Sequence, residues 1–347
     1  MERETVSATA LFEAPADDEL AAALLDYLRA AHGTTGLAFA SPPARILGGF
    51  DTLVYGFSLR APSAALAGPL ILRLYRDADG PPRAQREAAV QNAAAGLGYP
   101  TPRVLDVCVD RGVLGGAFQV MQRLPGRVML DAFFGPALLR LPIVLADLHL
   151  RLHALDATCF PAHLALPGEP APLERDFSQA AAAITHARLD DLQPLLAWLR
   201  AHRPPPAATV LCHGDFHPLN VLVDGGAVSG VLDWARARLA EPAWDVGASV
   251  ALFMQGPLRM PAALQGIAAA LRRWLANRYV RAYARRRPLS GASLRYYEAL
   301  RCFGFLIEGG EHQRAGAGVI AAIAKPTAFG DARTLAAIHR RLAKLTR

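Results

Sequence analysis

The stretch that decides the fold is Leu211-Cys-His-Gly-Asp-Phe-His-Pro-Leu-Asn-Val-Leu222, followed by Gly230-Val-Leu-Asp-Trp234 and Glu241-Pro-Ala-Trp-Asp-Val-Gly247. Its polar residues recur at fixed intervals: Asn220 lies five residues after Asp215, and Asp233 lies thirteen residues after Asn220. Two β-type runs, 221–223 and 228–232, are joined by the turn Asp224-Gly-Gly226. This pattern predicts a hairpin that carries the chain from Asn220 to Asp233.

The spacing of these residues matches one known kind of loop. His213-Gly-Asp215 with Asn220 has the spacing of the kinase catalytic loop H-R-D-x-x-x-x-N. In that loop one carboxylate faces an acceptor hydroxyl, here Asp215. An amide and a second carboxylate, here Asn220 and Asp233, converge on magnesium that carries nucleotide phosphates.

Two simpler interpretations compete with this one. His213 and His217 form an H-x-x-x-H pair, which on a helix would favour zinc, but Pro218 and the lack of an intervening Glu argue against a helix of that type. Asp215 and Asp233 could also be surface turn carboxylates. The hairpin and Trp234 in register with them favour a site.

Before this stretch, the pattern of apolar residues changes from helical to β-type and then back to mostly helical. Residues 18–31 have apolar side chains at helical spacing and predict a leading helix. The following region predicts a small antiparallel sheet with one helix, and from 125 onward the pattern is mostly helical. The expected strands are 53–59, 70–75, 104–109 and 117–123, and the expected helices are 83–97, 137–155, 177–201, 261–286, 292–308 and 331–345. We therefore predict an α+β, bilobal fold, with a small β lobe over 1–124 and a larger helical lobe over 125–347.

Composition narrows the class of protein. The chain has 347 residues, of which 52% are hydrophobic and 19% charged, which excludes wholesale disorder. Its start, Met-Glu-Arg-Glu, is not typical of a signal peptide, and the four cysteines lie far apart, so we expect a cytoplasmic protein with reduced thiols. The net charge is +7, but 37 basic residues include only two lysines, Lys325 and Lys344, so a catalytic cation before them must be Arg.

With these motifs the sequence resembles the aminoglycoside phosphotransferase and choline kinase-like superfamily, over roughly residues 45–310. That resemblance implies a protein-kinase-like fold and Mg²⁺-dependent transfer of a phosphoryl group from ATP or GTP to a small molecule. It implies that Asp215 is the catalytic base and that Asn220 and Asp233 are the metal ligands. His213 and Asp245 would support the loop.

The resemblance also assigns residues of the small lobe. Gly48 and Gly49 would belong to a loop that covers the nucleotide. A kinase places a cation on its third strand and pairs it with a Glu on the next helix. Arg73 fits that position with Glu87 as its partner, and Arg76 is the competing choice. Residues Met121 to Arg123 resemble the hinge that binds the nucleobase.

We expect a kinase for a hydroxyl group of a small molecule, with no nucleic acid and no membrane as a partner. A nucleotide-binding protein without transfer and a nucleic-acid binder are the alternatives. Beyond residue 245 the sequence has 17 Arg or Lys and four acidic residues, which makes a polycationic aminoglycoside a less favoured acceptor. Glu298, Glu308 and Glu311 could nevertheless face the cleft together. The sequence does not separate ATP from GTP or set the oligomeric state.

Overall fold

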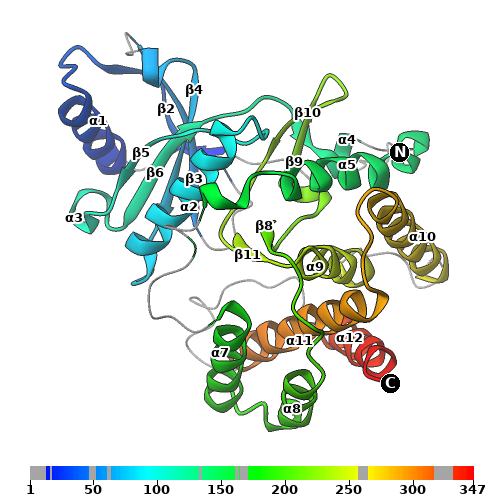
Figure 1. The fold of residues 1–347 in the computed structure, drawn as a ribbon. Coiled ribbons are helices and arrows are strands. Elements are labelled where there is room, and N and C mark those ends of the chain that lie inside the picture. The colour runs from blue at the N-terminus through cyan, green and yellow to red at the C-terminus, as the bar shows by residue number, and fades with distance from the viewer. Residues whose placement is uncertain are drawn as a thin grey trace, which may run out of the picture. The chain divides into compact units, whose positions relative to one another are not determined.

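A computed structural model describes residues 13–15, 18–46, 52–60, 64–132, 135–160, 164, 171–256, 265–315 and 331–347. Their contacts divide the chain into two compact units. The sheet unit comprises Met1–Ala132 and Val221–Ala235, and the helical unit comprises Phe133–Asn220 and Arg236–Arg347 (Figure 1). Each unit is described by itself below.

The sheet unit is built on an antiparallel sheet with the strand order β1-β2-β3-β4-β6-β5. In its central pair, Arg73 of β4 lies opposite Gln119 of β6. Alternate residues of β4, Leu70, Leu72 and Leu74, are fully buried, as expected for a strand with one face on a core. The strands are β1 Glu13–Pro15, β2 Ala38–Ile46, β3 Leu53–Arg60, β4 Pro69–Tyr75, β5 Val104–Cys108 and β6 Ala117–Gln122.

Two helices of this unit pack on the sheet. Helix α1 (Asp18–His32) buries Leu24 and Leu28 in the core formed with β3, β4 and β6. Helix α2 (Gly80–Gly96) presents small residues to the strands, and its buried face also carries Glu87. The short helices are α3 Arg111–Leu114 and α4 Met129–Ala132, with the 3-10 turn η1 Ala64–Leu66.

The predicted hairpin is present in the sheet unit. Strands β9 (Val221–Asp224) and β10 (Ala227–Val231) pair antiparallel, and β7 (Arg127–Val128) adds a third strand. Gly225 and Gly226 both have positive φ, 56° and 86°, which a two-residue turn of this kind requires.

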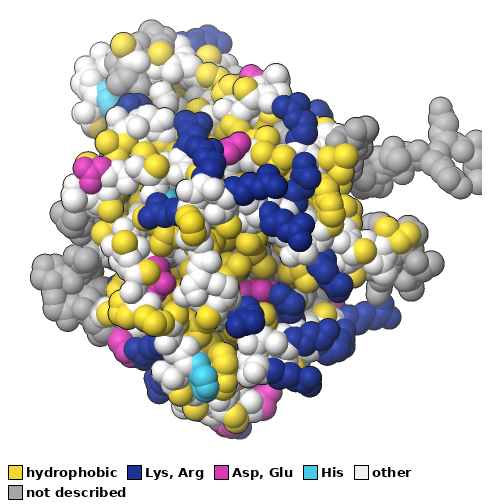
Figure 2. All heavy atoms as spheres, turned by 45° about the vertical axis from the view of Figure 1, so that its right-hand side comes forward, with side chains coloured by type: hydrophobic (Ala, Val, Ile, Leu, Met, Phe, Trp, Pro, Cys, Tyr) yellow, Lys and Arg dark blue, Asp and Glu magenta, His cyan; other side chains and the backbone are white. Residues whose placement is uncertain are grey.

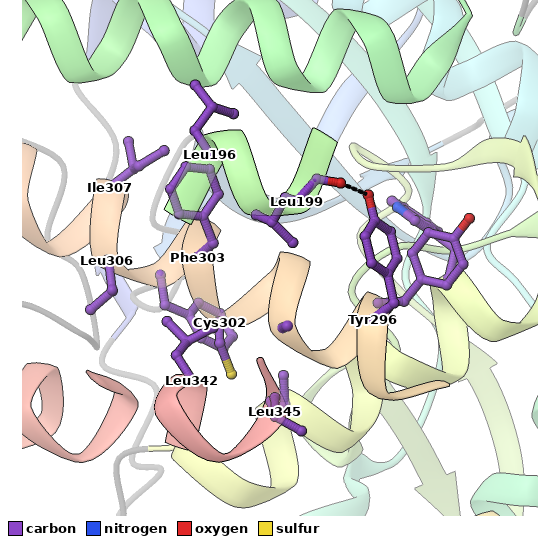
Figure 3. Packing of buried hydrophobic residues seen from close by; sticks show 14 of the residues in the cluster. Leu196, Leu199, Tyr296, Cys302, Phe303, Leu306, Ile307, Leu342 and Leu345 are labelled. Atoms are coloured by element: carbon purple, nitrogen blue, oxygen red, sulfur yellow. Dashed lines mark hydrogen bonds between the residues drawn. The ribbon is translucent and has the colours of Figure 1, made fainter. Parts of the chain in front are cut away.

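The helical unit packs around one large apolar core (Figure 3). Leu196 and Leu199 of α8 meet Phe303, Leu306 and other residues of α11, and the Tyr296 hydroxyl donates a hydrogen bond to the Leu199 carbonyl at 2.8 Å. Its helices are α5 Leu141–His153, α7 Pro172–His186, α8 Gln193–Ala201, α9 Pro242–Gln255, α10 Gln265–Ala284, α11 Gly291–Ala315 and α12 Ala332–Leu345. Strands β8 Val210–Cys212 and β11 Arg238–Ala240 and the turns η2 Gly135–Leu139, η3 Ala157–Cys159, η4 Asp190–Leu192 and η5 Pro218–Asn220 complete it.

One predicted helix is wrong in its continuity. The run 177–201 is split into α7 and α8, and Arg188 between them has a left-handed φ of 48°. The Leu189 amide donates to the Ile184 carbonyl at 2.9 Å and closes the end of α7. A helix end of this type commonly has glycine where Arg188 stands, but Pro194, in the first turn of α8, was a readable sign that the run is broken.

In the view of Figure 2, Lys and Arg side chains are more numerous than those of Asp and Glu. Several arginines of the helical unit form ion pairs with carboxylates, including Arg286 with Asp147 at 2.9 Å and Arg341 with Glu298 at 2.6 Å. Part of the basic excess is therefore neutralised within the fold. Among the described helices none is long and apolar enough to cross a membrane.

Candidate active site

The loop 213–220 lies in the helical unit and follows β8, which pairs with β11. Its second residue, Gly214, has φ of +82°. A Cβ at Gly214 would lie 2.7 Å from the Arg236 carbonyl oxygen and 2.7 Å from the Trp244 ring. Glycine is therefore required here, both for its backbone angle and for the close approach of two neighbours.

We expect Gly214→Ala to lower the free energy of unfolding by about 2–4 kcal/mol, from the left-handed backbone and from overpacking. Gly225→Ala is the matched control: it also has positive φ, at 56°, but nothing lies within 4 Å of the added Cβ. Urea unfolding of both variants measures the difference. Equal losses would show that the contacts at Gly214 contribute nothing.

The backbone of this loop is fixed by hydrogen bonds to Asp245, which lies in the first turn of α9. Asp245 is fully buried, and its carboxylate accepts hydrogen bonds from the backbone amides of His213 at 2.6 Å and Gly214 at 2.8 Å. Two consecutive amides are thus fixed by one side chain from another element. This fixes the backbone just before Asp215.

Two histidines of α5 support Asp245 in turn. His149 and His153 place Nε2 at 2.9 Å and 3.3 Å from the same Asp245 oxygen. Their Nδ1 atoms lie 2.5 Å from the Tyr279 hydroxyl and 2.6 Å from the Tyr283 hydroxyl of α10. The spacing of four residues on one helix puts both imidazoles on one face. We call these five residues the buried network.

His149, His153 and Asp245 lie close enough together to bind a metal ion, but their hydrogen bonds already explain the arrangement. Both carboxylate oxygens accept backbone amides, and both histidines have a second partner. Burial, and then the neighbouring His149, lower the pKa of His153 to about 4. Burial by itself would raise the pKa of Asp245, but the facing imidazoles outweigh it and lower that pKa well below its usual range.

The lowered pKa of His153 predicts acid sensitivity. Between pH 6.5 and about 4 the unfolded chain protonates this histidine while the folded chain keeps it neutral. The unfolded state then binds more protons, so stability is complete above pH 6.5 and falls as the pH drops toward 4. We expect a loss of roughly 2–3 kcal/mol between pH 7 and pH 4.5. Urea unfolding at both pH values should show this loss for the parent chain and a clearly smaller one for His153→Gln; an equal loss in both would contradict the assignment.

Asp215 and Asn220 are brought together within the helical unit. The Asn220 amide nitrogen donates to the Asp215 backbone carbonyl at 2.9 Å and to its carboxylate at 3.1 Å. His217 lies 3.2 Å from the same carboxylate oxygen. Burial would raise the pKa of Asp215, but His217, Arg301 and Arg236 together hold it well below its usual range. Asp215 is therefore ionised at neutral pH and accepts hydrogen bonds.

A second constellation lies in the sheet unit around Arg73. Its guanidinium contacts Glu87 at 2.7 Å, the Thr52 hydroxyl at 3.0 Å and Asp233 at 3.3 Å. Glu87 is 1% exposed and also accepts from Tyr75 at 2.9 Å and Arg83 at 2.8 Å. Burial alone would lower the pKa of Arg73, but Glu87, Tyr75 and Asp233 raise it above its ordinary value.

Arg76, the competing choice, is exposed, and the ion pair with Glu87 is made by Arg73. Asp233 has a left-handed φ of 63°, which Asp tolerates better than most residues, and its side chain is 44% exposed. The buried Trp234 next to it donates to the Thr101 hydroxyl at 2.9 Å and anchors the segment. Asp233 is therefore held by its neighbours with its carboxylate partly open.

Four further residues were predicted to bind the nucleotide, and the structure describes two of them. Gly48 and Gly49 lie outside the described residues. Met121 is buried in β6, opposite Ile71 of β4. Arg123 follows the strand, and its backbone amide donates to the Pro69 carbonyl at 2.9 Å.

The family model described as the phosphotransferase enzyme family matches residues 44–289, which is most of the chain. The chain belongs to this family. The match includes Arg73, Glu87, the loop 213–220 and Asp233. It thereby confirms the resemblance that the sequence motifs indicated.

Two curated relatives illustrate the range of the family. The chain is 29% identical over 178 residues to acyl-CoA dehydrogenase family member 10 of Mus musculus, covering 48% of this chain and 16% of that protein. It is 32% identical over 162 residues to the aminoglycoside 3'-phosphotransferase of Streptomyces fradiae, covering 43% of this chain and 57% of that protein. The chain thus spans only part of the length of the curated relatives it matches.

Solved structures confirm the fold class. A thermostable mutant of aminoglycoside phosphotransferase APH(4)-Ia, in a ternary complex with ADP and hygromycin B, has a TM-score of 0.59 at 19% identity and covers 94% of this chain and 98% of its own. Macrolide 2'-phosphotransferase MphH from Brachybacterium faecium has a TM-score of 0.51 at 20% identity, covering 91% and 97%. At these identities the likeness concerns the fold of this phosphotransferase family member.

Sequence reasoning missed two parts of this family member's site. The first is the histidines and tyrosines of the buried network, of which only Asp245 was predicted to support the loop, although His149 and His153 stand four residues apart on a predicted helix. The second is the arginines around Asp215: Arg301 Nη2 lies 4.0 Å from its carboxylate. Nothing in the local sequence of α11 marks Arg301, because its role depends on packing between distant elements.

The three glutamates that could have faced one cleft do not act together. Glu298 is buried and receives two hydrogen bonds from Arg341, at 2.6 Å and 2.8 Å. Glu308 contacts Arg301 at 2.7 Å and lines a different cavity from Glu298. Glu311 is exposed. They therefore do not form a carboxylate-lined pocket.

Proposed function

We propose that this chain is a small-molecule kinase that transfers the γ-phosphoryl group of ATP or GTP to a hydroxyl group of a small acceptor. The observation that carries the proposal is the state of Asp215. This carboxylate is ionised and partly open, lies in hydrogen-bond contact with Asn220, and follows two amides that Asp245 fixes. A carboxylate that is ionised and fixed in this way can accept a hydrogen bond from a hydroxyl group and orient it for reaction.

The low pKa of Asp215 decides how it acts. Because its pKa is low, the carboxylate is a weak base. It accepts a hydrogen bond from the acceptor hydroxyl and so orients the hydroxyl oxygen toward the phosphorus. It accepts the proton itself only late, as the new oxygen–phosphorus bond forms. Asn220 and His217 hold the carboxylate in place by contacts at 3.1 Å and 3.2 Å. Most of the catalysis then comes from positioning and electrostatics.

The donor set fits a hard divalent cation. The Asn220 amide nitrogen is directed at Asp215, which leaves its oxygen as an available ligand, and one Asp233 oxygen lies against Arg73 while the side chain stays 44% exposed. Amide and carboxylate oxygens are the ligands that Mg²⁺ prefers. We propose that Asn220 and Asp233 hold Mg²⁺, which when bound neutralises charge on the phosphates.

Arg73 is proposed to bind the nucleotide phosphates while Glu87 fixes its direction. We expect Arg73→Met to raise the KM for the nucleotide roughly 10-fold to 100-fold, because a charge-assisted hydrogen bond contributes about 1.5–3 kcal/mol. Arg76→Met is the matched control, because Arg76 is exposed directly after the end of β4, and its KM should stay within about twofold of the parent value. Steady-state kinetics at varied nucleotide concentration measure both KM values. A larger rise in KM for Arg76→Met than for Arg73→Met would assign the phosphate-binding role to Arg76.

Gly48 and Gly49 are proposed to cover the phosphates, and Met121 and Arg123 to border the nucleobase. We place the reaction in the cytoplasm, where the donor nucleotide is abundant, and the described cysteines Cys108, Cys159, Cys212 and Cys302 are all unpaired thiols. The partners of the protein are then a nucleotide and a small hydroxylated acceptor.

The test is Mg²⁺-dependent nucleotide consumption by the purified chain, with a panel of alcohols that includes aminoglycosides, macrolides, amino alcohols, sugars and hydroxy acids. Turnover that an acceptor stimulates and that Asp215→Ala and Asp233→Ala both abolish is the expected result. ATP and GTP are compared as donors. Nucleotide binding without stimulated turnover would favour a binding protein, and absence of Mg²⁺-dependent nucleotide binding would contradict the proposal.

A further inference from the structure

A cavity of about 210 Å³ lies wholly within the helical unit, beside the loop that carries Asp215. Apolar side chains of α7, α9 and α11 form much of its lining, including Phe177, Trp244 and Phe303. The charged side chains on its wall are Asp176, Arg236, Arg301 and Glu308. Arg301 connects the cavity to the loop, because its NH2 lies 4.0 Å from the Asp215 carboxylate.

Both carboxylates of the cavity wall already have cationic partners. Asp176 receives two hydrogen bonds from Arg238, at 2.6 Å and 2.9 Å. Glu308 accepts from Arg301 at 2.7 Å and lies 3.6 Å from Arg236. An ammonium group that entered would meet no carboxylate without a guanidinium beside it among the described residues. The cavity is therefore poorly suited to a polycation.

Hydrogen-bond donors, by contrast, are in excess. Arg301 has only 9% of its side chain exposed, and its Nε is buried without a hydrogen-bond partner among the described residues. Its Nη1 donates to Glu308, and its Nη2 is too far from Asp215 for a hydrogen bond. Nη2 is therefore the donor of Arg301 that an incoming acceptor group could use.

Arg236 stands beside Arg301 and adds to the positive potential. Both guanidinium groups approach the same Glu308 oxygen, Arg301 at 2.7 Å and Arg236 at 3.6 Å, so the two lie close together, and the charge of Arg301 lowers the pKa of Arg236. Arg236 is 43% exposed, and Glu308 is its carboxylate contact, at 3.6 Å. The two guanidinium groups face two carboxylates, Glu308 and Asp215, but only the Arg301 contact with Glu308 is within hydrogen-bond distance. The N–H groups that remain can donate to a further anion.

We propose that this cavity receives the acceptor and that the acceptor is a small hydroxylated anion, whose carboxylate or phosphate group binds Arg301 and Arg236 while its hydroxyl group faces Asp215. This inference rests on the kinase function proposed above. The apolar lining and the charged side chains at one part of the wall suit a small acceptor that carries its charged group close to its hydroxyl group. The distance of 4.0 Å between Arg301 and Asp215 further requires that the hydroxyl and the anionic group be only a few bonds apart.

The reaction at this site balances as a simple transfer. The acceptor oxygen forms a bond to the γ-phosphorus, and the bond from that phosphorus to the β-bridging oxygen breaks. The nucleoside diphosphate leaves with the electron pair of that bond. The hydroxyl proton passes through Asp215 to solvent.

The first test measures binding with matched probes. Lactate, lactamide and isopropanolamine share a carbon chain and a hydroxyl group but differ in charge, and glycerol phosphate and glycerol repeat the comparison for a phosphate. Binding is followed by the fluorescence of the protein, in which Trp244 lines the cavity. We expect at least one anion to bind about tenfold or more tightly than its neutral counterpart. A preference for lactate over lactamide would indicate a carboxylate, and a preference for glycerol phosphate over glycerol would indicate a phosphate.

The variants are Arg301→Gln and Arg236→Gln, with Arg295→Gln as the control on the same helix, because Arg295 is exposed and does not line this cavity. The first two should remove the preference for the anion, and the control should keep it. Arg236 is partly exposed, so its variant tests the inference even if loss of the buried Arg301 prevents folding. Equal binding of anion and neutral probe by the parent chain would overturn the inference.

A second measurement separates this inference from the proposed function. If neutral or cationic alcohols stimulate nucleotide turnover as well as anionic ones, and Arg236→Gln leaves their kcat/KM unchanged, the kinase stands and the anionic acceptor is wrong. If no alcohol of any charge stimulates turnover, the kinase function fails. The binding comparison still decides then whether Arg301 and Arg236 recognise an anion.

Discussion

Asp215→Asn is expected to lower the kcat of acceptor-stimulated turnover by roughly 100-fold to 10,000-fold, the range that a positioned acid–base group contributes. The substitution keeps the shape of the side chain but removes the charge that aligns the hydroxyl. The contacts with Asn220 at 3.1 Å and His217 at 3.2 Å leave room for an amide of the same size. The chain should still fold, but with lower stability, because the interactions of the charged carboxylate with His217, Arg301 and Arg236 are lost. The nucleotide affinity of the folded protein should stay within a few-fold.

The pH profile of the parent chain tests the same residue in another way. His217, Arg301 and Arg236 outweigh burial and hold the pKa of Asp215 well below its usual range. Asp215 then stays ionised across the whole range in which the fold is stable. We expect kcat/KM to show no loss between about pH 8 and pH 5 that is due to protonation of Asp215.

Asp191→Asn is the control, since Asp191 is exposed in the same unit and far from the loop in sequence. It should leave kcat within about twofold. Retention of more than a tenth of the parent kcat by Asp215→Asn would show that this carboxylate is not the group that orients the acceptor. The assay is initial-rate nucleotide consumption at saturating acceptor.

The parts of the fold that the sequence predicted correctly are those whose signals are local. The hairpin 221–231 could be read because two glycines with positive φ stand between two β-type runs. The pairing of β8 with β11 could not, because each strand has three residues and their register depends on residues 26 or more apart. Short strands without a connecting turn have no signature of their own.

The site shows the same division. The pattern from His213 to Asp233 indicated the phosphotransferase family, which the family match confirms, because its residues are close in sequence. The contact between Arg73 and Glu87 was predicted from the position of a strand and the next helix, and the structure has the two at 2.7 Å. Arg301, by contrast, approaches Asp215 from a helix more than eighty residues away. Such a contact follows from tertiary packing, which no local spacing reveals.

Asp245→Asn is expected to have the largest effect on stability, a loss of roughly 3–5 kcal/mol, because it removes one partner from a buried charged network. An amide has one oxygen to offer, while the His213 and Gly214 amides and two imidazoles all face the present carboxylate. At least one buried donor then loses its acceptor. Urea unfolding at pH 7 measures the loss.

The same substitution should also lower kcat in the fraction that stays folded, because Asp245 fixes the two amides that precede Asp215. Asp147→Asn is the matched control: it lies on α5 with the two histidines, but its side chain is 54% exposed and its pair with Arg286 is on the surface, so a change within about 0.5 kcal/mol is expected. If Asp245→Asn were as stable and as active as Asp147→Asn, the loop would be held by its own backbone. The buried network would then be packing rather than the support of the catalytic loop.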